Sequence, residues 1–208
     1  MIKVTLGNGE IKEFDAPLSA FDAARELGEA KTACAAEIDG KVCDLRTTLT
    51  DGCTVKFLTF EDEQGQRAFN HTASHVLAQA VKRLFPATKL AIGPAIENGF
   101  YYDVDLGDTK LTDEDLAAIE KEMKKICKEN LPIKPFILPR DEAVKLMEER
   151  QEHYKIEHIA DLADETEFSF YQQGEYVDMC IGPHLCYTKA LKAFKITQQS
   201  GAYWKNDK

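Results

Sequence analysis

The sequence predicts an α+β protein of two units, a small one at residues 1–61 and a larger one at residues 62–208. Short alternating apolar segments joined by Asn-Gly or Asp-Gly pairs predict hairpins in both units. Other segments carry apolar residues at helical spacing, with capping residues at their ends. A polar stretch at residues 61–67, which contains Gly65, is predicted to be the linker between the units.

The first unit is expected to lay one helix across a small mixed sheet. Asn8-Gly9 and Asp39-Gly40 predict hairpin turns, and Asp51-Gly52 predicts a further turn before a buried strand. Gly28 is placed to stop the helix. In order, the unit reads strand, strand, helix, hairpin and strand, at residues 2–6, 11–14, 17–28, 34–43 and 48–60. Such an arrangement buries the apolar faces of both helix and sheet.

The second unit is expected to begin with a helix over residues 70–85, which Pro86 stops. Two strands joined near Asn98-Gly99 follow, and then a long helix for which Thr112 is the N-cap. A short strand and a short helix that starts at Pro139 come next. The remainder is predicted to be strands and loops, with strand-like segments at residues 168–171, 175–180 and 193–204.

Composition restricts the class of protein. With 44% hydrophobic and 30% charged residues, the 208-residue chain is expected to be soluble and globular. No segment approaches the ~18 apolar residues that span a bilayer, and the N-terminus does not resemble a signal peptide. We therefore expect a cytoplasmic protein without a membrane partner, whose six cysteines are thiols.

Charge is distributed unevenly along the chain. The net charge of −10 argues against a general nucleic-acid coat. From Leu185 to the end, however, there are five lysines and one acidic residue. Lys189, Lys192 and Lys195 are therefore candidate tRNA-phosphate contacts, although an ordinary solvated segment would have the same composition.

Two short motifs carry residues that can do chemistry. "HTASH" (residues 71–75) places His71 and His75 on one face of a helix, nearly opposite the centre of its apolar stripe. "CIGPH" (residues 180–184) places Cys180 at a strand end and His184 beyond a Gly-Pro break. Taken alone, the histidine pair is better explained by solvent exposure, and the second motif is a weak signal that a buried cysteine and a loop histidine also explain.

The two motifs together are more informative. Three imidazoles and a thiolate, one pair on a helix and one on a turn, form a donor set that suits zinc. The same side chains suit hydrolysis without a metal, because imidazoles can position and deprotonate water. Lys155 and Asp178 are candidates to join them, and Asp178 shares a strand face with Cys180.

Longer segments carry a specific resemblance. "HTASHVLAQAVKRLFPATKLAIGPAIENGFYYDVDL", "EYVDMCIGPH" and "SGAYWKND" resemble the N-terminal editing domain of bacterial threonyl-tRNA synthetases, and residues 1–61 resemble the ubiquitin-like TGS domain that precedes it. The resemblance implies a β-grasp TGS domain at 1–61 and an editing domain at 62–208. It also implies an enzyme that hydrolyses the ester by which serine is wrongly attached to threonine-specific tRNA.

By this resemblance the catalytic set is His71, His75, Lys155, Asp178, Cys180 and His184, with Tyr102 and Asp178 contacting the substrate. We expect His71 and Lys155 to position and activate the attacking water, and Asp178 to bind the amino group or hydroxyl of serine. His75, Cys180 and His184 are expected to form the walls of the pocket. The threonyl branch implies no metal in the editing site, whereas the related alanyl branch implies zinc on the two residue pairs, which here are His71, His75, Cys180 and His184. The absence of class II motifs implies a fragment that neither uses ATP nor activates threonine. The parent enzyme is expected to be a homodimer, and the fragment a monomer.

Two readings from other classes stay open. One is a zinc-dependent deacylase of the alanyl-editing type, and the other is a tRNA-binding module without catalysis. Metal analysis and a panel of mischarged tRNAs separate the first from the main reading. The complete set of potential catalytic side chains argues against the second.

Overall fold

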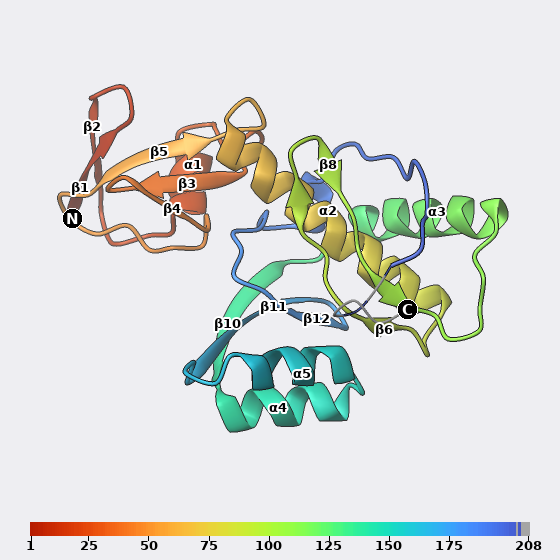
Figure 1. Ribbon diagram of the computed structural model, residues 1–208. Coiled ribbons are helices and arrows are strands. Elements are labelled where there is room, and N and C mark those ends of the chain that lie inside the picture. Colours follow the sequence, from red (N-terminus) through yellow and green to blue (C-terminus); the bar gives the residue numbers. More distant parts are fainter. Residues whose placement is uncertain (203, 205–208) are drawn as a thin grey trace.

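The computed structural model describes residues 1–202 and Trp204, and its elements form two bodies joined by one long helix (Figure 1). The first body contains a five-stranded sheet in the order β2-β1-β5-β3-β4, with β1 and β5 parallel. Its strands are β1 (Ile2–Leu6), β2 (Ile11–Phe14), β3 (Ala35–Ile38), β4 (Lys41–Cys43) and β5 (Thr54–Leu58), and its helix is α1 (Ala20–Glu26).

Turn chemistry fixes the elements of the first body. Gly9, Gly28, Gly40 and Gly52 all have positive φ, at the four places where the sequence predicts a turn or a helix stop. Ser19 caps α1 by accepting a hydrogen bond from the Asp22 backbone N–H. The apolar faces of α1 and the sheet then close over a single core. The predicted order of elements is confirmed.

The predicted linker is wrong. Helix α2 (Glu63–Leu84) starts soon after β5 and includes most of residues 61–67. Gly65 explains why so polar a segment can pack closely: a Cβ at this position would collide with the carbonyl group of Thr59. Glycine therefore lets the first turn of α2 lie directly against the end of β5, and the connection is helical rather than extended.

The second body places a three-stranded antiparallel sheet between two groups of helices (Figure 1). Its strands are β10 (Ile133–Pro139), β11 (Glu167–Gln173) and β12 (Tyr176–Met179). Phe168, Phe170 and Val177 pack on α4 (Arg140–Glu149) and α5 (His153–Asp161). Tyr171 belongs to a different core, which α2 shares with α3 (Asp113–Glu129). Alternation along β11 thus gives the sheet two faces with different partners.

Three predictions about the second body need correction. The segment after Pro86 forms four two-residue strands rather than two longer ones: β6 (Lys89–Leu90), β7 (Ala95–Ile96), β8 (Gly99–Phe100) and β9 (Val104–Asp105). Helix α5 was not predicted. Residues 193–202 form no strand, and after β12 the described chain is irregular apart from the short helix η1 (Thr188–Ala190) and isolated bridges.

Among the described residues, no helix is long and apolar enough to cross a membrane.

Candidate functional site

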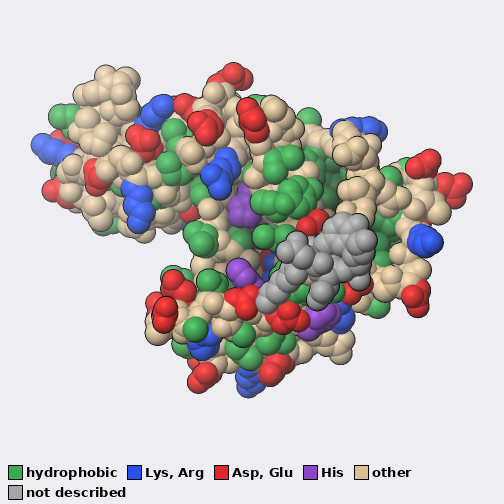
Figure 2. All heavy atoms as spheres, viewed as in Figure 1, with side chains coloured by type: hydrophobic (Ala, Val, Ile, Leu, Met, Phe, Trp, Pro, Cys, Tyr) green, Lys and Arg blue, Asp and Glu red, His purple; other side chains and the backbone are tan. Residues whose placement is uncertain are grey.

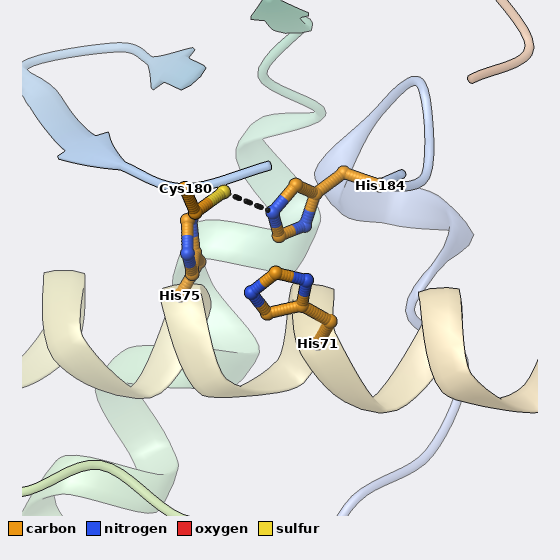
Figure 3. Close-up of side chains that lie close together, drawn as sticks. All are labelled: His71, His75, Cys180 and His184. Atoms are coloured by element: carbon orange, nitrogen blue, oxygen red, sulfur yellow. Dashed lines mark hydrogen bonds between the residues drawn. The ribbon is translucent and has the colours of Figure 1, made fainter. Parts of the chain in front are cut away.

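Helix α2 is buried on almost every side, so the histidine face is covered as well as the apolar stripe. His75 is 1% exposed, and His71 is only partly exposed. Solvent exposure of the pair, the alternative left open by the sequence, is therefore wrong for His75. What covers this face is the loop that follows β12, which carries Cys180 and His184 (Figure 3).

The loop reaches α2 because Gly182 turns it. Gly182 has φ +66°, and a Cβ there would collide with the hydroxyl end of Tyr171. Beyond the turn, the fully buried His184 lies with its ring centroid 4.2 Å from those of both His71 and His75. The nearest donor atoms of the four predicted residues, His71, His75, Cys180 and His184, all lie within 4.8 Å of one another. The two motifs do meet.

Thr72 sets the orientation of His184. Its Oγ1 donates to the Ala68 carbonyl (3.0 Å) and accepts from the Leu185 backbone N–H (3.0 Å). It also lies 3.0 Å from His184 Nδ1. Since the single hydroxyl proton is used on Ala68, Nδ1 must be the donor in this third contact. Nε2 of His184 is then unprotonated, and it lies 3.1 Å from the Sγ of Cys180.

A second buried cluster adjoins the histidines. Asp178 of β12 forms an ion pair with the Nζ of Lys155 on α5 (2.8 Å), and both side chains are almost fully buried. The other carboxylate oxygen accepts hydrogen bonds from the hydroxyls of Tyr102 and Tyr176. Lys155 Nζ also donates to the Tyr102 hydroxyl (3.1 Å). The structure thus brings together Lys155, Asp178 and Tyr102, as the sequence predicts.

His75 joins the two clusters. Its Nε2 lies 3.6 Å from Asp178 Oδ2, while its ring contacts those of His71 and His184. Its Nδ1 is buried and has no hydrogen-bond partner among the described residues. A buried polar atom without a hydrogen bond raises the free energy of the folded state, so Nδ1 marks a place where a substrate atom, a water or an ion can add a contact.

Burial decides the charge of these groups. Desolvation lowers the pKa of His71 to about 4, although Asp178 opposes the shift; Arg67 and Lys155 add to it. Desolvation likewise holds the pKa values of His75 and His184 well below the usual range, and it raises that of the Cys180 thiol. At neutral pH the imidazoles are therefore free bases, and Cys180 is a thiol that donates to His184.

The four donors could hold a metal ion. His184 presents an unprotonated Nε2 and His75 a nitrogen without a partner, and His71 and Cys180 complete an N/S set of the kind that zinc takes. Thr72 would act as the outer partner that orients a histidine ligand. Bound zinc would supply a Lewis acid and a water of lowered pKa.

Two residues of the first body make contacts that the sequence did not predict. Asp44 accepts hydrogen bonds from the backbone N–H of His184 (3.3 Å) and from the Tyr171 hydroxyl (2.8 Å). Arg46 donates to the carbonyls of Ile133 (2.6 Å) and Cys186 (2.7 Å). These residues hold the loop that carries His184. No local pattern signals such contacts, because the partners are far away along the chain.

The predicted tRNA lysines do not join the site. Lys189, Lys192 and Lys195 are exposed and lie in and after the short helix η1. Lys195 lies 3.4 Å from a carboxylate oxygen of Glu120. Lys205 and Lys208, which belong to the same predicted patch, lie outside the described residues.

Comparisons with known proteins identify two domain families in the chain. Residues 2–59 match the TGS domain, and residues 168–207 match the threonyl and alanyl tRNA synthetase second additional domain. The chain carries both domains. The second match includes Asp178, Cys180 and His184, while the two histidines of α2 precede it.

Whole-chain relatives are threonine–tRNA ligases. The chain is 51% identical to the enzyme of Clostridioides difficile (strain 630), and the alignment covers 100% of this chain and 33% of the relative. Identity to the enzyme of Clostridium perfringens (strain SM101 / Type A) is 53%, with 100% and 32% covered. The chain spans about a third of the length of these relatives and corresponds to their N-terminal part.

Proposed function

We propose that the second additional domain removes serine from wrongly charged threonine tRNA by hydrolysing the ester between them. The observation that carries this proposal is a half-buried, neutral imidazole, His71, beside the buried Lys155–Asp178 pair. A free-base imidazole that solvent can still reach is the group that ester hydrolysis needs. Similarity to threonine–tRNA ligases supports the choice of tRNA.

In the proposed reaction, water attacks the ester carbonyl while His71 takes its proton. Lys155, held by Asp178 and Tyr102, stabilises the negative charge that develops on the carbonyl oxygen. The ribose oxygen leaves and is protonated, which releases serine and free tRNA. His75, Cys180 and His184 form the wall of the pocket.

Both oxygens of Asp178 are already engaged, one by Lys155 and the other by two tyrosine hydroxyls. We therefore propose that Asp178 orients Lys155 and Tyr102. The predicted contact between Asp178 and the serine amino group would have to displace one of these partners.

Selection of serine follows from size. Threonine carries one more methyl group, and a missing methyl is worth only ~1–3 kcal/mol to a pocket that binds threonine. A second pocket with rigid walls can reverse the preference by excluding the larger side chain. The rings of His75 and His184, whose centroids lie 4.2 Å apart, form part of such a wall.

Single-turnover deacylation of seryl- and threonyl-charged threonine tRNA tests the proposal. We expect rapid loss of serine and slow loss of threonine, unchanged by a chelator. Tight tRNA binding without deacylation would instead favour the non-catalytic module. Activity that is lost with a chelator, together with one zinc per chain that disappears in Cys180→Ser, would favour the zinc-dependent alternative.

A further inference from the structure

A small hollow opens beside His71, at the junction of the two domains. Its volume is about 150 Å³, and it is lined by Val42 of β4, by Gln64, Arg67 and His71 of α2, and by Gly182 and Pro183 of the site loop. Figure 2 shows histidine side chains at the surface between the first domain and the hydrophobic side chains of the second. The hollow therefore adjoins the proposed catalytic group, and both domains contribute to it.

Arg67 differs from the other five arginines of the chain. Arg25 and Arg83 pair with carboxylates, and Arg46, Arg140 and Arg150 donate to carbonyls. Over the described residues, the exposed guanidinium of Arg67 meets no hydrogen-bond or ion-pair partner, and neither does the amide of Gln64. Two sets of unused N–H donors thus line one hollow in a chain of net charge −10.

The spacing along α2 relates this cation to the site. Arg67 and His71 are four residues apart, so they project from one face of the helix, with Cβ atoms about 5–6 Å apart. In the proposed reaction the ester lies at His71, so we expect the terminal ribose to lie at the opening of the hollow. The 5′ phosphate of that same nucleotide is one sugar away from the ester, a distance similar to one helical turn.

We propose that the hollow binds the 5′ phosphate of the 3′-terminal nucleotide of tRNA, with Arg67 as its cation and Gln64 as a second donor. This inference rests on the proposed deacylation at His71. A guanidinium matches the oxygens of a phosphate with two parallel hydrogen bonds. A phosphate contact positions a nucleic acid without reading its sequence. Arg67 is accordingly a positioning residue, which sets where the ester lies relative to His71.

Two small substrates that differ only in the 5′ phosphate test the proposal. Both carry serine as an ester on a ribose hydroxyl; one is seryl adenosine, and the other is the same ester of adenosine 5′-monophosphate (AMP). For Arg67→Ala we expect kcat/KM to fall about tenfold on the AMP ester, mainly through KM, and to stay unchanged on the adenosine ester. Arg67→Lys should recover part of the loss. Equal loss on both esters, or no loss on either, would overturn the proposal.

Binding of uncharged threonine tRNA gives a readout that does not depend on hydrolysis. Removing one phosphate contact from a single-stranded end should reduce the slope of log K against log salt by about 0.7. Lys31→Ala, an exposed cation of the first domain, is the matched control and should leave the slope unchanged. A slope that Arg67→Ala leaves unchanged rejects the phosphate contact. If the wild type hydrolyses no ester, the proposed function fails, and the slope still decides the contact.

Discussion

The two domains place their polar groups differently. In the first, every buried side chain is apolar or a cysteine, and the ion pairs are at the surface. All of the buried polar or charged residues among those described lie at position 70 or beyond, and they include His75, Lys155, Asp178 and His184. The first domain is built like an ordinary small core, whereas the second holds desolvated ionisable groups in fixed positions.

This difference separates stability from chemistry. Burying ionisable groups costs free energy unless they are paired, and the pairing in turn shifts their pKa values. Such shifts cluster at functional sites. The first domain contributes by contact instead: Asp44 and Arg46 hold the loop on which His184 lies. The comparison predicts that substitutions of the site residues of the second domain change rates, whereas substitutions of Asp44 and Arg46 change stability first.

The largest effect is expected at His71. For His71→Ala, the rate of single-turnover deacylation of seryl-tRNA should fall ~10²-fold or more, as for loss of a positioned acid–base group. The fold should persist, since the side chain is only partly buried. His158→Ala, which removes an exposed histidine from α5, is the control. A folded His71→Ala protein with the wild-type rate would refute the catalytic role.

Lys155→Ala should reduce the rate similarly, and the double variant should be little slower than either single variant, because both residues serve one step. Among the described residues, Asp178 has two basic neighbours, Lys155 and the neutral His75. Removing Lys155 would leave the buried Asp178 carboxylate without a cation, which can destabilise the fold. Circular dichroism and thermal unfolding therefore have to accompany this measurement. Multiplicative losses in the double variant would mean that the two residues act on separate steps.

Thr72→Val should give a smaller loss, about tenfold in the rate, with little change in KM. The substitution keeps the shape but removes the oxygen that accepts the proton of His184 Nδ1. ¹⁵N NMR of the imidazoles should report the Nδ1–H form in the wild type and in Thr72→Ser, and lose it in Thr72→Val. An Nε2–H form in the wild type would contradict the assigned tautomer.

Arg46→Met should affect stability more than chemistry. It removes hydrogen bonds to two carbonyls of the second domain, and we expect a loss of about 1–3 kcal/mol in the free energy of unfolding. Arg25→Met breaks a surface ion pair in the same domain and should stay within about 0.5 kcal/mol of the wild type. Equal effects of the two substitutions would show that the interdomain contact adds nothing.

Acid should destabilise the second domain. The folded pKa of His71, about 4, lies below that of the unfolded chain, so between these two values the unfolded state binds more protons. The free energy of unfolding should therefore fall as the pH drops from about 6.5 towards 4. His71→Gln should weaken this dependence in chelator-treated protein. An identical pH profile for the two proteins would mean that His71 is not desolvated.

The smallest effect is expected from Lys189, Lys192 and Lys195. Neutralising all three should lower the salt slope of tRNA binding by ~1 for each phosphate that these lysines neutralise in the wild type. Because Lys195 already lies beside Glu120, its share should be the smallest. An unchanged slope would leave Arg67 as the better-supported phosphate ligand.

Prediction from the sequence succeeded where the signal was local. Asn8-Gly9, Asp39-Gly40 and Thr112 specify a turn or a cap through their own backbone and side-chain chemistry, and the elements follow. The meeting of "HTASH" and "CIGPH" was accessible because the residue types suit one another. Gly65 was misread, because a glycine that permits close helix packing looks the same in sequence as a glycine in a linker.

What failed depended on distant partners. Helix α5 is only nine residues long and has no side-chain N-cap hydrogen bond to signal its start, yet it carries Lys155 to Asp178. The burial of His75 could not be predicted from α2 alone, because the loop that covers it lies about a hundred residues later in the sequence. Nothing around Asp44 indicates that its carboxylate will meet the backbone of His184.

Helix α2 starts soon after β5 and runs without interruption past His71 and His75. Because its first turn packs against the end of β5, it is a rigid connection between the first domain and the two histidines. A movement of the first domain, such as one caused by contact with a bound nucleic acid, would therefore rotate or translate α2 and both imidazoles together. Their spacing relative to each other would be preserved, while their spacing from Cys180 and His184 would change. Alignment of the site is thus a property of the joint between the domains as well as of the pocket.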